Sequence, residues 1–125
     1  MAVRKEKGKI AITNYKTLEI FQNLNLPKIS LVECALETGR THQIRVHMSF
    51  KGNPILGDKS YGKSKKKFKK IDLNIEKKIN KFNRQALHAK SLGFVHPRTG
   101  KEIFFEAERP KDFDKLIKSL KKASI

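Results

Sequence analysis

The stretch Leu36-Glu-Thr-Gly-Arg-Thr-His-Gln-Ile-Arg-Val-His-Met48 predicts the strand-to-helix turn around which the rest of the chain is arranged. An apolar run, Ile29–Leu36, ends at a Thr-Gly-Arg corner and passes into a segment with helical spacing. Ile44, His47 and Met48 share one side of that helix. A strand that passes through a glycine turn into a short helix presents polar groups at a sheet edge. These groups define a candidate site or, alternatively, a solvated basic turn: Arg40, His42, Gln43 and Arg45.

Length and composition predict one soluble domain. The chain has 125 residues, 38% of them hydrophobic, and no apolar run approaches the ~18 residues of a membrane span. The chain does not open with a secretory signal pattern. Cys34, a single thiol within a predicted strand, is typical of a buried structural cysteine in a reducing compartment. We therefore expect a cytoplasmic location.

The charge predicts a polyanionic partner. Twenty-nine Lys and Arg residues against twelve Asp and Glu residues give a net charge of +17. Such an excess favours RNA or DNA over an acidic membrane, because the sequence has no basic amphipathic helix with aromatic anchors. The alternative is a basic protein without a nucleic-acid function.

The first half of the chain predicts a hairpin followed by a helix. Ile10–Phe21 is rich in β-branched and aromatic residues, and Ile29–Glu37 returns as a second strand after a turn cluster at Asn23–Pro27. Because the second strand is almost continuously apolar, we expect both its faces to be covered. Thr41–Phe50 is the short helix, and the turn Lys51-Gly-Asn-Pro54 closes it.

The second half predicts a loop, a second hairpin and a closing helix. Lys63–Lys81 carries nine lysines and predicts a mobile loop, with one helical turn around Ile75–Ile79. Its lysines are either solvated or in contact with phosphates. The remaining elements complete an α+β fold with a mixed, mainly antiparallel sheet and a few short helices. They are a strand at Ala86–Val95, a loop at His96–Gly100, a strand at Glu102–Ala107 and an amphipathic helix at Pro110–Leu120.

Two other kinds of site are disfavoured. Gly57-Asp-Lys-Ser-Tyr-Gly-Lys-Ser64 matches the phosphate-binding pattern of nucleotide hydrolases, but a proline precedes it and a lysine tract follows it. His42 and His47 lie roughly 140° apart around a helix, so they cannot share one metal ion from that helix. Cys34, His88 and His96 have no metal-ligand spacing. We predict no metal and no cofactor.

Several motifs together resemble the RluA-type RNA pseudouridine synthases. The resemblance extends from about Gly8 to Phe113, with the lysine-rich loop in a region where that family varies. It rests on Glu37–Met48, Gly52–Gly62, Gln85–Ala89, Phe94–Gly100 and Ala107–Phe113.

The resemblance implies a function and a site. Enzymes of this family flip a uridine out of RNA, detach the base, rotate it and rejoin it through carbon, without cofactor or metal. An Asp attacks and a Tyr is the candidate proton acceptor. The Arg of the motif His-Gln-Ile-Arg, here Arg45, pairs with the catalytic Asp, and a planar guanidinium can bind both carboxylate oxygens. Arg40, His42 and Gln43 are expected either to surround and support the site or to contact RNA, and we expect phosphate contacts from Lys65, Lys66 and Lys67.

The sequence departs from the family at one decisive point. The family's catalytic Asp lies in a segment like His-Arg-Leu-Asp-x-x-Thr-Ser-Gly, which is absent between Met1 and Ile125. Neither Tyr15 nor Tyr61 inherits the catalytic Tyr, and Asp58 is considered only as a displaced nucleophile.

Residues 1–125 are therefore expected to be the C-terminal portion of a synthase catalytic domain, with 63–81 as its lysine-rich loop. We expect such a chain to be inactive without an N-terminal half that carries the Asp. The alternative is a non-catalytic basic RNA-binding module on a degenerate synthase scaffold. The RNA, ribosomal or transfer, is left open.

Overall fold

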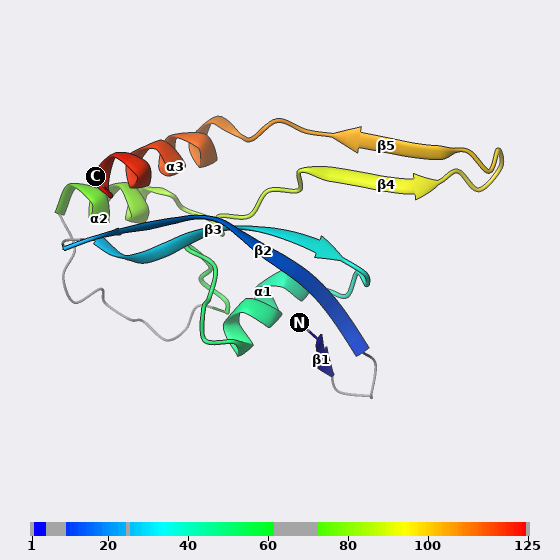
Figure 1. Cartoon of the computed structure of the whole chain (residues 1–125), viewed down its shortest axis with the longest axis horizontal. Coiled ribbons are helices and arrows are strands. Elements are labelled where there is room, and N and C mark those ends of the chain that lie inside the picture. Colours follow the sequence, from blue (N-terminus) through cyan, green and yellow to red (C-terminus); the bar gives the residue numbers. More distant parts are fainter. Residues whose placement is uncertain (1, 5–9, 25, 62–72, 125) are drawn as a thin grey trace.

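A computed structural model describes residues 2–4, 10–24, 26–61 and 73–124 of the chain. Within these residues two antiparallel sheets and three helices confirm the predicted α+β class. The first sheet has the order β1-β2-β3, and the second consists of β4 and β5 (Figure 1). The bounds are β1 Ala2–Arg4, β2 Ile10–Asn23, β3 Leu26–Leu36, α1 Gln43–Phe50, α2 Leu73–Lys81, β4 Ser91–Val95, β5 Glu102–Glu106 and α3 Lys111–Ala123.

The predicted first hairpin is confirmed and is longer than expected. β2 and β3 pair in antiparallel register from Thr13 opposite Leu36 to Asn23 opposite Leu26, with irregularities that follow Thr17 and Phe21. The expectation that both faces of β3 are covered is wrong, since Leu26 alone among its side chains is buried. The other side chains of β3 are exposed or only partly buried, so a nearly continuous apolar sequence did not indicate burial on both faces here.

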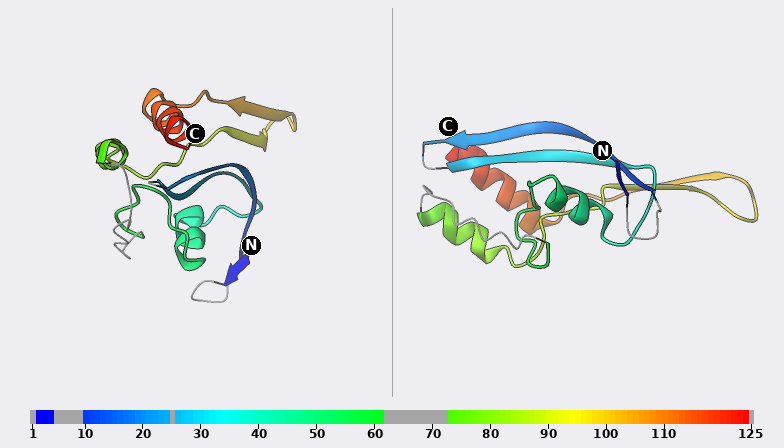
Figure 2. Two further views of the ribbon diagram at one scale, coloured as in Figure 1. Left: turned by 60° about the vertical axis from the view of Figure 1, so that its left-hand side comes forward. Right: turned by 90° about the horizontal axis from the view of Figure 1, so that it is seen from below.

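The main core lies between one end of this hairpin and the two later helices. Phe21 of β2 and Leu26 of β3 pack with Ile75 and Ile79 of α2 and with the apolar side of α3. Figure 2 shows α2 and α3 side by side at the end of the hairpin. On α3 the buried residues have the three- and four-residue spacing that the sequence predicts: Leu116, Ile117 and Leu120.

Helix α2 corrects the predicted lysine-rich loop. The part of that loop which the structure describes, Leu73–Lys81, is a regular helix rather than a single turn. Ile75 and Ile79 lie one turn apart, and burial against α3 stabilises a helix whose lysine content suggested a solvated loop. The preceding residues of the loop, among them Lys65, Lys66 and Lys67, lie outside the described residues.

Helix α1 packs on the other half of β2. His47 and Met48 face the strand, where Ala11 and Thr13 have no solvent exposure. A hydrogen bond of 2.7 Å joins His47 Nδ1 to Thr13 Oγ1. This contact fixes the rotation of α1 about its own axis, so that the remaining side of the helix faces outward.

Strands β4 and β5 form a two-stranded ribbon that extends away from the body (Figures 1 and 2). The predicted strand Ala86–Val95 is wrong over its first five residues, because Ala86 bonds instead to the backbone of Leu56. The predicted loop His96–Gly100 is confirmed. No helix in the described ranges is both long and apolar enough to cross a membrane.

Candidate active site

The turn before α1 is held by a buried glutamine. Gln43 Oε1 accepts hydrogen bonds from the backbone N–H of Arg40 at 3.0 Å and from Thr38 Oγ1 at 2.6 Å. Its Nε2 donates to Ile12 O and Thr13 Oγ1, both at 2.9 Å. Every polar atom of the side chain is therefore engaged within the fold. These bonds tie the turn to β2 and fix where the following residues of α1 point.

His42 precedes α1 in a left-handed backbone conformation. Its φ of 49° and ψ of 32° are sparsely populated for a residue that carries a Cβ. The conformation turns the exposed His42 side chain toward Tyr61, and His42 Nδ1 and the Tyr61 hydroxyl share a hydrogen bond of 3.0 Å.

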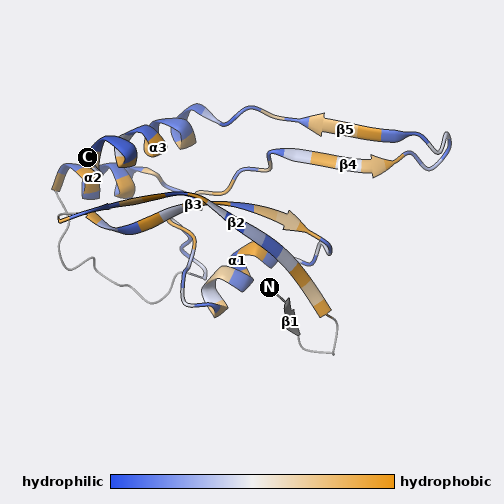
Figure 3. Ribbon diagram, in the orientation of Figure 1, coloured by the Kyte–Doolittle hydropathy of each residue, from blue (hydrophilic) through white to orange (hydrophobic). Residues whose placement is uncertain are grey.

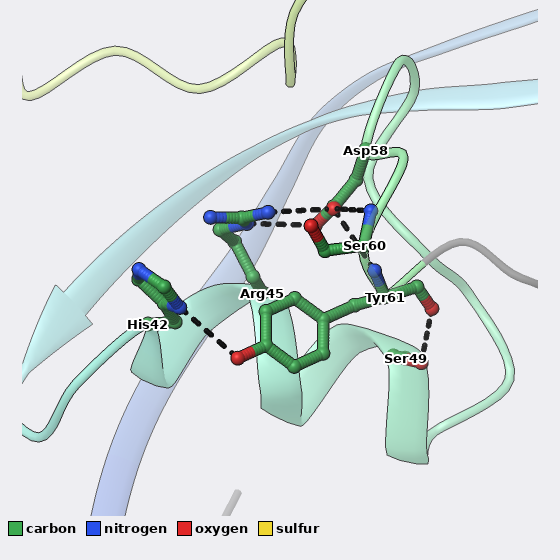
Figure 4. A network of polar contacts seen from close by, with 6 residues as sticks. All are labelled: His42, Arg45, Ser49, Asp58, Ser60 and Tyr61. Atoms are coloured by element: carbon green, nitrogen blue, oxygen red, sulfur yellow. Dashed lines mark hydrogen bonds and ion pairs between the residues drawn. The ribbon is translucent and has the colours of Figure 1, made fainter.

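Arg45 and Asp58 form a two-bonded ion pair at the centre of the site (Figure 4). Arg45 Nε donates to Asp58 Oδ2 and Arg45 Nη2 donates to Asp58 Oδ1, each at 2.9 Å. The Asp58 side chain has no solvent exposure, whereas that of Arg45 retains 13%. The hydrogen bond from Arg45 is the main reason that the pKa of Asp58 lies below its ordinary value, and the carboxylate in turn raises the pKa of Arg45.

The loop that carries Asp58 wraps its backbone around the carboxylate. The N–H groups of Ser60 and Tyr61 both donate to Asp58 Oδ1 at 3.1 Å. Gly57 has a φ of +80°, and Leu56 O accepts a hydrogen bond of 2.8 Å from Ala86 N, which docks the loop on the later chain. In the described part of the nucleotide-hydrolase pattern, the backbone N–H groups of Ser60 and Tyr61 thus bind the protein's own carboxylate.

The aromatic ring of Tyr61 packs against the Arg45 guanidinium. The Arg45 guanidinium carbon lies 4.9 Å from the centre of the Tyr61 ring, within the range of a cation–π contact. Tyr61 is itself held by its hydroxyl on His42 and by Ser49, whose hydroxyl donates to Tyr61 O at 2.6 Å. Asp58, Tyr61 and α1 therefore restrict the Arg45 guanidinium from three sides, as Figure 4 shows.

A cleft of about 270 Å³ opens beside this cluster. Its lining comes from three segments of the chain. The basic side chains of Arg40, His42 and Arg45, together with Gln85, surround an apolar patch. The lining residues are Leu36, Arg40, His42, Gln43, Ile44, Arg45, Gln85 and Leu87. A planar ligand with anionic groups fits this combination, because aliphatic side chains contact its face and guanidinium groups bind its anions.

The structure brings four of the predicted site residues together. Arg40, His42, Gln43 and Arg45 all line the cleft, although Gln43 is only 3% exposed. The hydrogen bonds of Gln43 give it a structural function in the turn, while its RNA contact stays a prediction. Three lysines predicted to contact phosphates cannot be placed, because they lie outside the described residues: Lys65, Lys66 and Lys67.

Sequence reasoning missed two features of the site. It named a carboxylate partner for Arg45 only as an absent residue, although Asp58, thirteen residues later, occupies one side of the guanidinium. It also gave no role to Tyr61. A local signal existed only for the turn, since an Asp side chain often accepts hydrogen bonds from backbone N–H groups two or three residues on. It does not indicate Arg45 as the partner.

Among the described residues, no three His, Cys, Asp or Glu side chains lie close enough together to hold a metal ion. His96 Nδ1 accepts hydrogen bonds from the N–H groups of Arg98 and Thr99, so this histidine shapes the hairpin loop. Cys34 is half-buried, and burial raises the pKa of its thiol. A raised thiol pKa leaves little thiolate at neutral pH, which is unlike a reactive cysteine.

Comparison with known proteins gives a consistent family. Residues 1–50 match a family model described as RNA pseudouridylate synthase. Over 114 residues the chain is 47% identical to "Ribosomal large subunit pseudouridine synthase D" of Zymomonas mobilis, covering 91% of this chain and 33% of that protein. Over 115 residues it is 50% identical to "Uncharacterized RNA pseudouridine synthase YlyB" of Bacillus subtilis, covering 92% of this chain and 32% of that protein. The chain spans about a third of the length of these relatives.

Proposed function

Because the chain belongs to the RNA pseudouridine synthase family, we propose that it supplies Arg45 and an RNA-facing surface to an enzyme that isomerises uridine in RNA. The residues belong to the C-terminal portion of the catalytic domain. Several relatives are named for the large ribosomal subunit, so ribosomal RNA in the cytoplasm is the proposed substrate and location. The catalytic carboxylate comes from a further segment, since no His-Arg-Leu-Asp-x-x-Thr-Ser-Gly motif lies between Met1 and Ile125.

The observation that carries this proposal is the unused side of Arg45. Asp58 takes Nε and Nη2, while Nη1 has no hydrogen-bond partner among the described residues. Figure 4 shows that Arg45 nitrogen directed away from Asp58, and Arg45 lines the cleft. A guanidinium has five N–H donors in a rigid plane, so it can bind two carboxylates on different edges. The second edge fits the catalytic Asp of the complete enzyme.

Asp58 is poorly suited to be that nucleophile. Its side chain is fully buried, and both oxygens accept hydrogen bonds from Arg45, Ser60 or Tyr61. A carboxylate with a lowered pKa and four donors around it is a weak base and cannot approach a substrate atom without breaking those bonds. These contacts support a positioning function for Asp58, which orients Arg45.

The ribbon of β4 and β5 offers a surface to which the proposed N-terminal half can bind. The two-stranded ribbon exposes large apolar side chains, and Figure 3 shows apolar residues along both of its strands. Leu92 and Phe94 of β4 and Phe105 of β5 are 61%, 43% and 58% exposed. A two-stranded ribbon is at best marginally stable alone, and a patch of this kind favours a protein partner.

The test is release of tritium from RNA labelled at uridine carbon 5, measured for the chain alone and mixed with an N-terminal half from a relative. We expect release in the mixture only. Arg45→Met should lower release by at least about 100-fold, in the range for removing a group that acts on charge in a transition state. Its RNA affinity should stay within about threefold, since Arg45 is one of many cations.

A matched control is Arg98→Met, which removes the same charge from the exposed hairpin loop and should leave tritium release unchanged. Activity of the chain alone would show that the nucleophile lies within residues 1–125. Equal activity of Arg45→Met and wild type in the mixture would refute the role of Arg45.

The second candidate is a non-catalytic basic RNA-binding module, and the net charge of +17 favours it. Binding of RNA with no release in any mixture would support this alternative. In both cases RNA affinity should fall steeply as salt rises.

A further inference from the structure

Helix α2 carries a stripe of polar and cationic side chains opposite its buried side. Asn74, Lys77, Lys78 and Lys81, here called the α2 stripe, are separated by three, four and seven residues and therefore lie on one side of the helix. All four are exposed. With Asn80 they line a shallow hollow of about 790 Å³. The stripe is roughly 10 Å long at the rise of an α-helix.

The lysines of the α2 stripe are uncompensated by described carboxylates. Lys77, Lys78 and Lys81 have no ion pair with any residue that the structure describes. On α3 only two of the five lysines form an ion pair with a described residue, Lys118 with Asp114 at 3.1 Å and Lys121 with Glu19 of β2 at 3.7 Å. The charge of the α2 stripe is thus available to an external anion, as is part of the charge on α3.

Helix stability alone accounts for only part of this arrangement. Lys78 and Lys81 lie in the last turn, where cations interact favourably with the helix dipole. Lys77 lies outside that turn and is four residues from Lys81, a spacing at which like charges repel. Lys77 therefore contributes to the stability of this nine-residue helix only through its intrinsic helix propensity.

We propose that the α2 stripe binds phosphates of the RNA substrate outside the cleft. Lysine ammonium groups bind phosphate oxygens as point charges, and the amide of the exposed Asn80 is a suitable phosphate donor. A membrane is a poorer fit, because the side of α2 with Ile75 and Ile79 is buried in the protein and cannot enter a bilayer. The inference rests on the proposed function, since it assigns part of the RNA contact of the same enzyme.

The test measures how RNA affinity of the 125-residue chain depends on salt. The stripe variant carries Lys77→Gln, Lys78→Gln and Lys81→Gln. A scattered control carries Lys16→Gln, Lys28→Gln and Lys101→Gln, three exposed lysines without an ion pair to described residues. Both variants lose three positive charges, so net charge is matched.

The probe is a labelled RNA hairpin with single-stranded flanks, followed by fluorescence anisotropy from low to high salt. Each lost phosphate contact lowers the slope of log affinity against log salt by about 0.7–0.9. We expect the slope of the stripe variant to fall by about 2–3, while the control keeps a slope near that of wild type.

An equal fall in both variants would show that net charge alone acts and would overturn the proposal. An unchanged slope in the stripe variant would also overturn it, as would tighter binding of the stripe to anionic lipid vesicles than to RNA. Failure of the wild-type chain to bind RNA at all would instead refute the proposed function. In the reconstituted enzyme the stripe variant should raise KM and keep kcat, unlike Arg45→Met.

Discussion

The Asp58 carboxylate accepts four hydrogen bonds from described residues, two from Arg45 and one each from the N–H groups of Ser60 and Tyr61. Asp58→Asn therefore places an amide NH2 against an N–H group of Arg45, Ser60 or Tyr61. Bonds to a charged group contribute about 1.5–3 kcal/mol each, so we expect a loss of about 2 kcal/mol in the free energy of unfolding at pH 7. Urea unfolding of both proteins measures it.

The same variant has a defined pH dependence. Because the pKa of Asp58 is lowered in the folded state, its stabilisation is fully present above the ordinary value of 3.8. It is lost as pH falls below 3.8 toward the lowered pKa. The difference between wild type and Asp58→Asn should thus be constant from pH 7 to pH 5 and shrink at pH 3. A difference that does not change with pH would show that Asp58 is not an ionised partner of Arg45.

At the residue scale the sequence indicated that Arg45 binds a carboxylate, but it did not indicate that Asp58 of the same chain is already bound to it. Arg45 was identified from its motif, whereas its contact with Asp58 depends on a loop whose path is set by Gly57 and Ala86. For Gln43 two roles were expected, support of the site or contact with RNA. It lies four residues from His47, on the buried side of α1, so helical periodicity favours the supporting role.

At the scale of elements, the loop with Asp58 is docked on the segment before β4. An ideal Cβ on Gly57 would lie 2.1 Å from the backbone oxygen of Arg84, and the φ of Gly57 is +80°. Gly57→Ala should therefore combine backbone strain with a clash and lower the free energy of unfolding by more than about 3 kcal/mol. It should also displace Asp58 and so weaken the hold on Arg45.

Gly52→Ala is the matched control for this substitution. Gly52 has a φ of +87°, but nothing lies within 4 Å of its ideal Cβ. It should lose only the backbone strain, about 1–2 kcal/mol, by thermal or urea unfolding. Equal losses in the two variants would mean that the approach of Gly57 to Arg84 does not fix the loop.

The elements themselves were predictable where local pattern and packing agree. The hairpin of β2 and β3 and the helix α3 follow their apolar periodicity and turn residues. The segment from Ala86 to Lys90 does not, because the backbone of Ala86 at its start bonds to Leu56 of the Asp58 loop and, within the described part of the chain, only the backbone of Lys90 at its end bonds to the chain that follows β5. Helix α2 was underestimated, since two isoleucines stabilise it only through contact with α3.

At the scale of the whole molecule, the order of expected strands and helices predicted the α+β class and the composition predicted a basic protein, while the distribution of apolar surface required the structure. The ribbon has two unlike faces, because side chains alternate along each strand. In register, Leu92 lies opposite Phe105 and Phe94 opposite Ile103, which makes one face apolar. The other face carries Ser91, Gly93, Val95, Glu102, Phe104 and Glu106. The carboxylates on this second face disfavour RNA there. The exposed apolar side chains of the first face favour a protein partner, so we expect that face to bind protein.

The last prediction concerns that apolar face. Phe94 and Phe105 stack with ring centres 6.1 Å apart, and both are exposed. Burying each ring in an interface is worth about 1.5–3 kcal/mol, so Phe94→Thr with Phe105→Thr should weaken binding of an N-terminal half by at least about 100-fold. Phe104→Thr removes a ring that is 64% exposed on the other face and should change this affinity less than about threefold. Titration calorimetry measures both. If the double variant instead lost RNA affinity and kept the N-terminal half, the two aromatic rings would stack on bases.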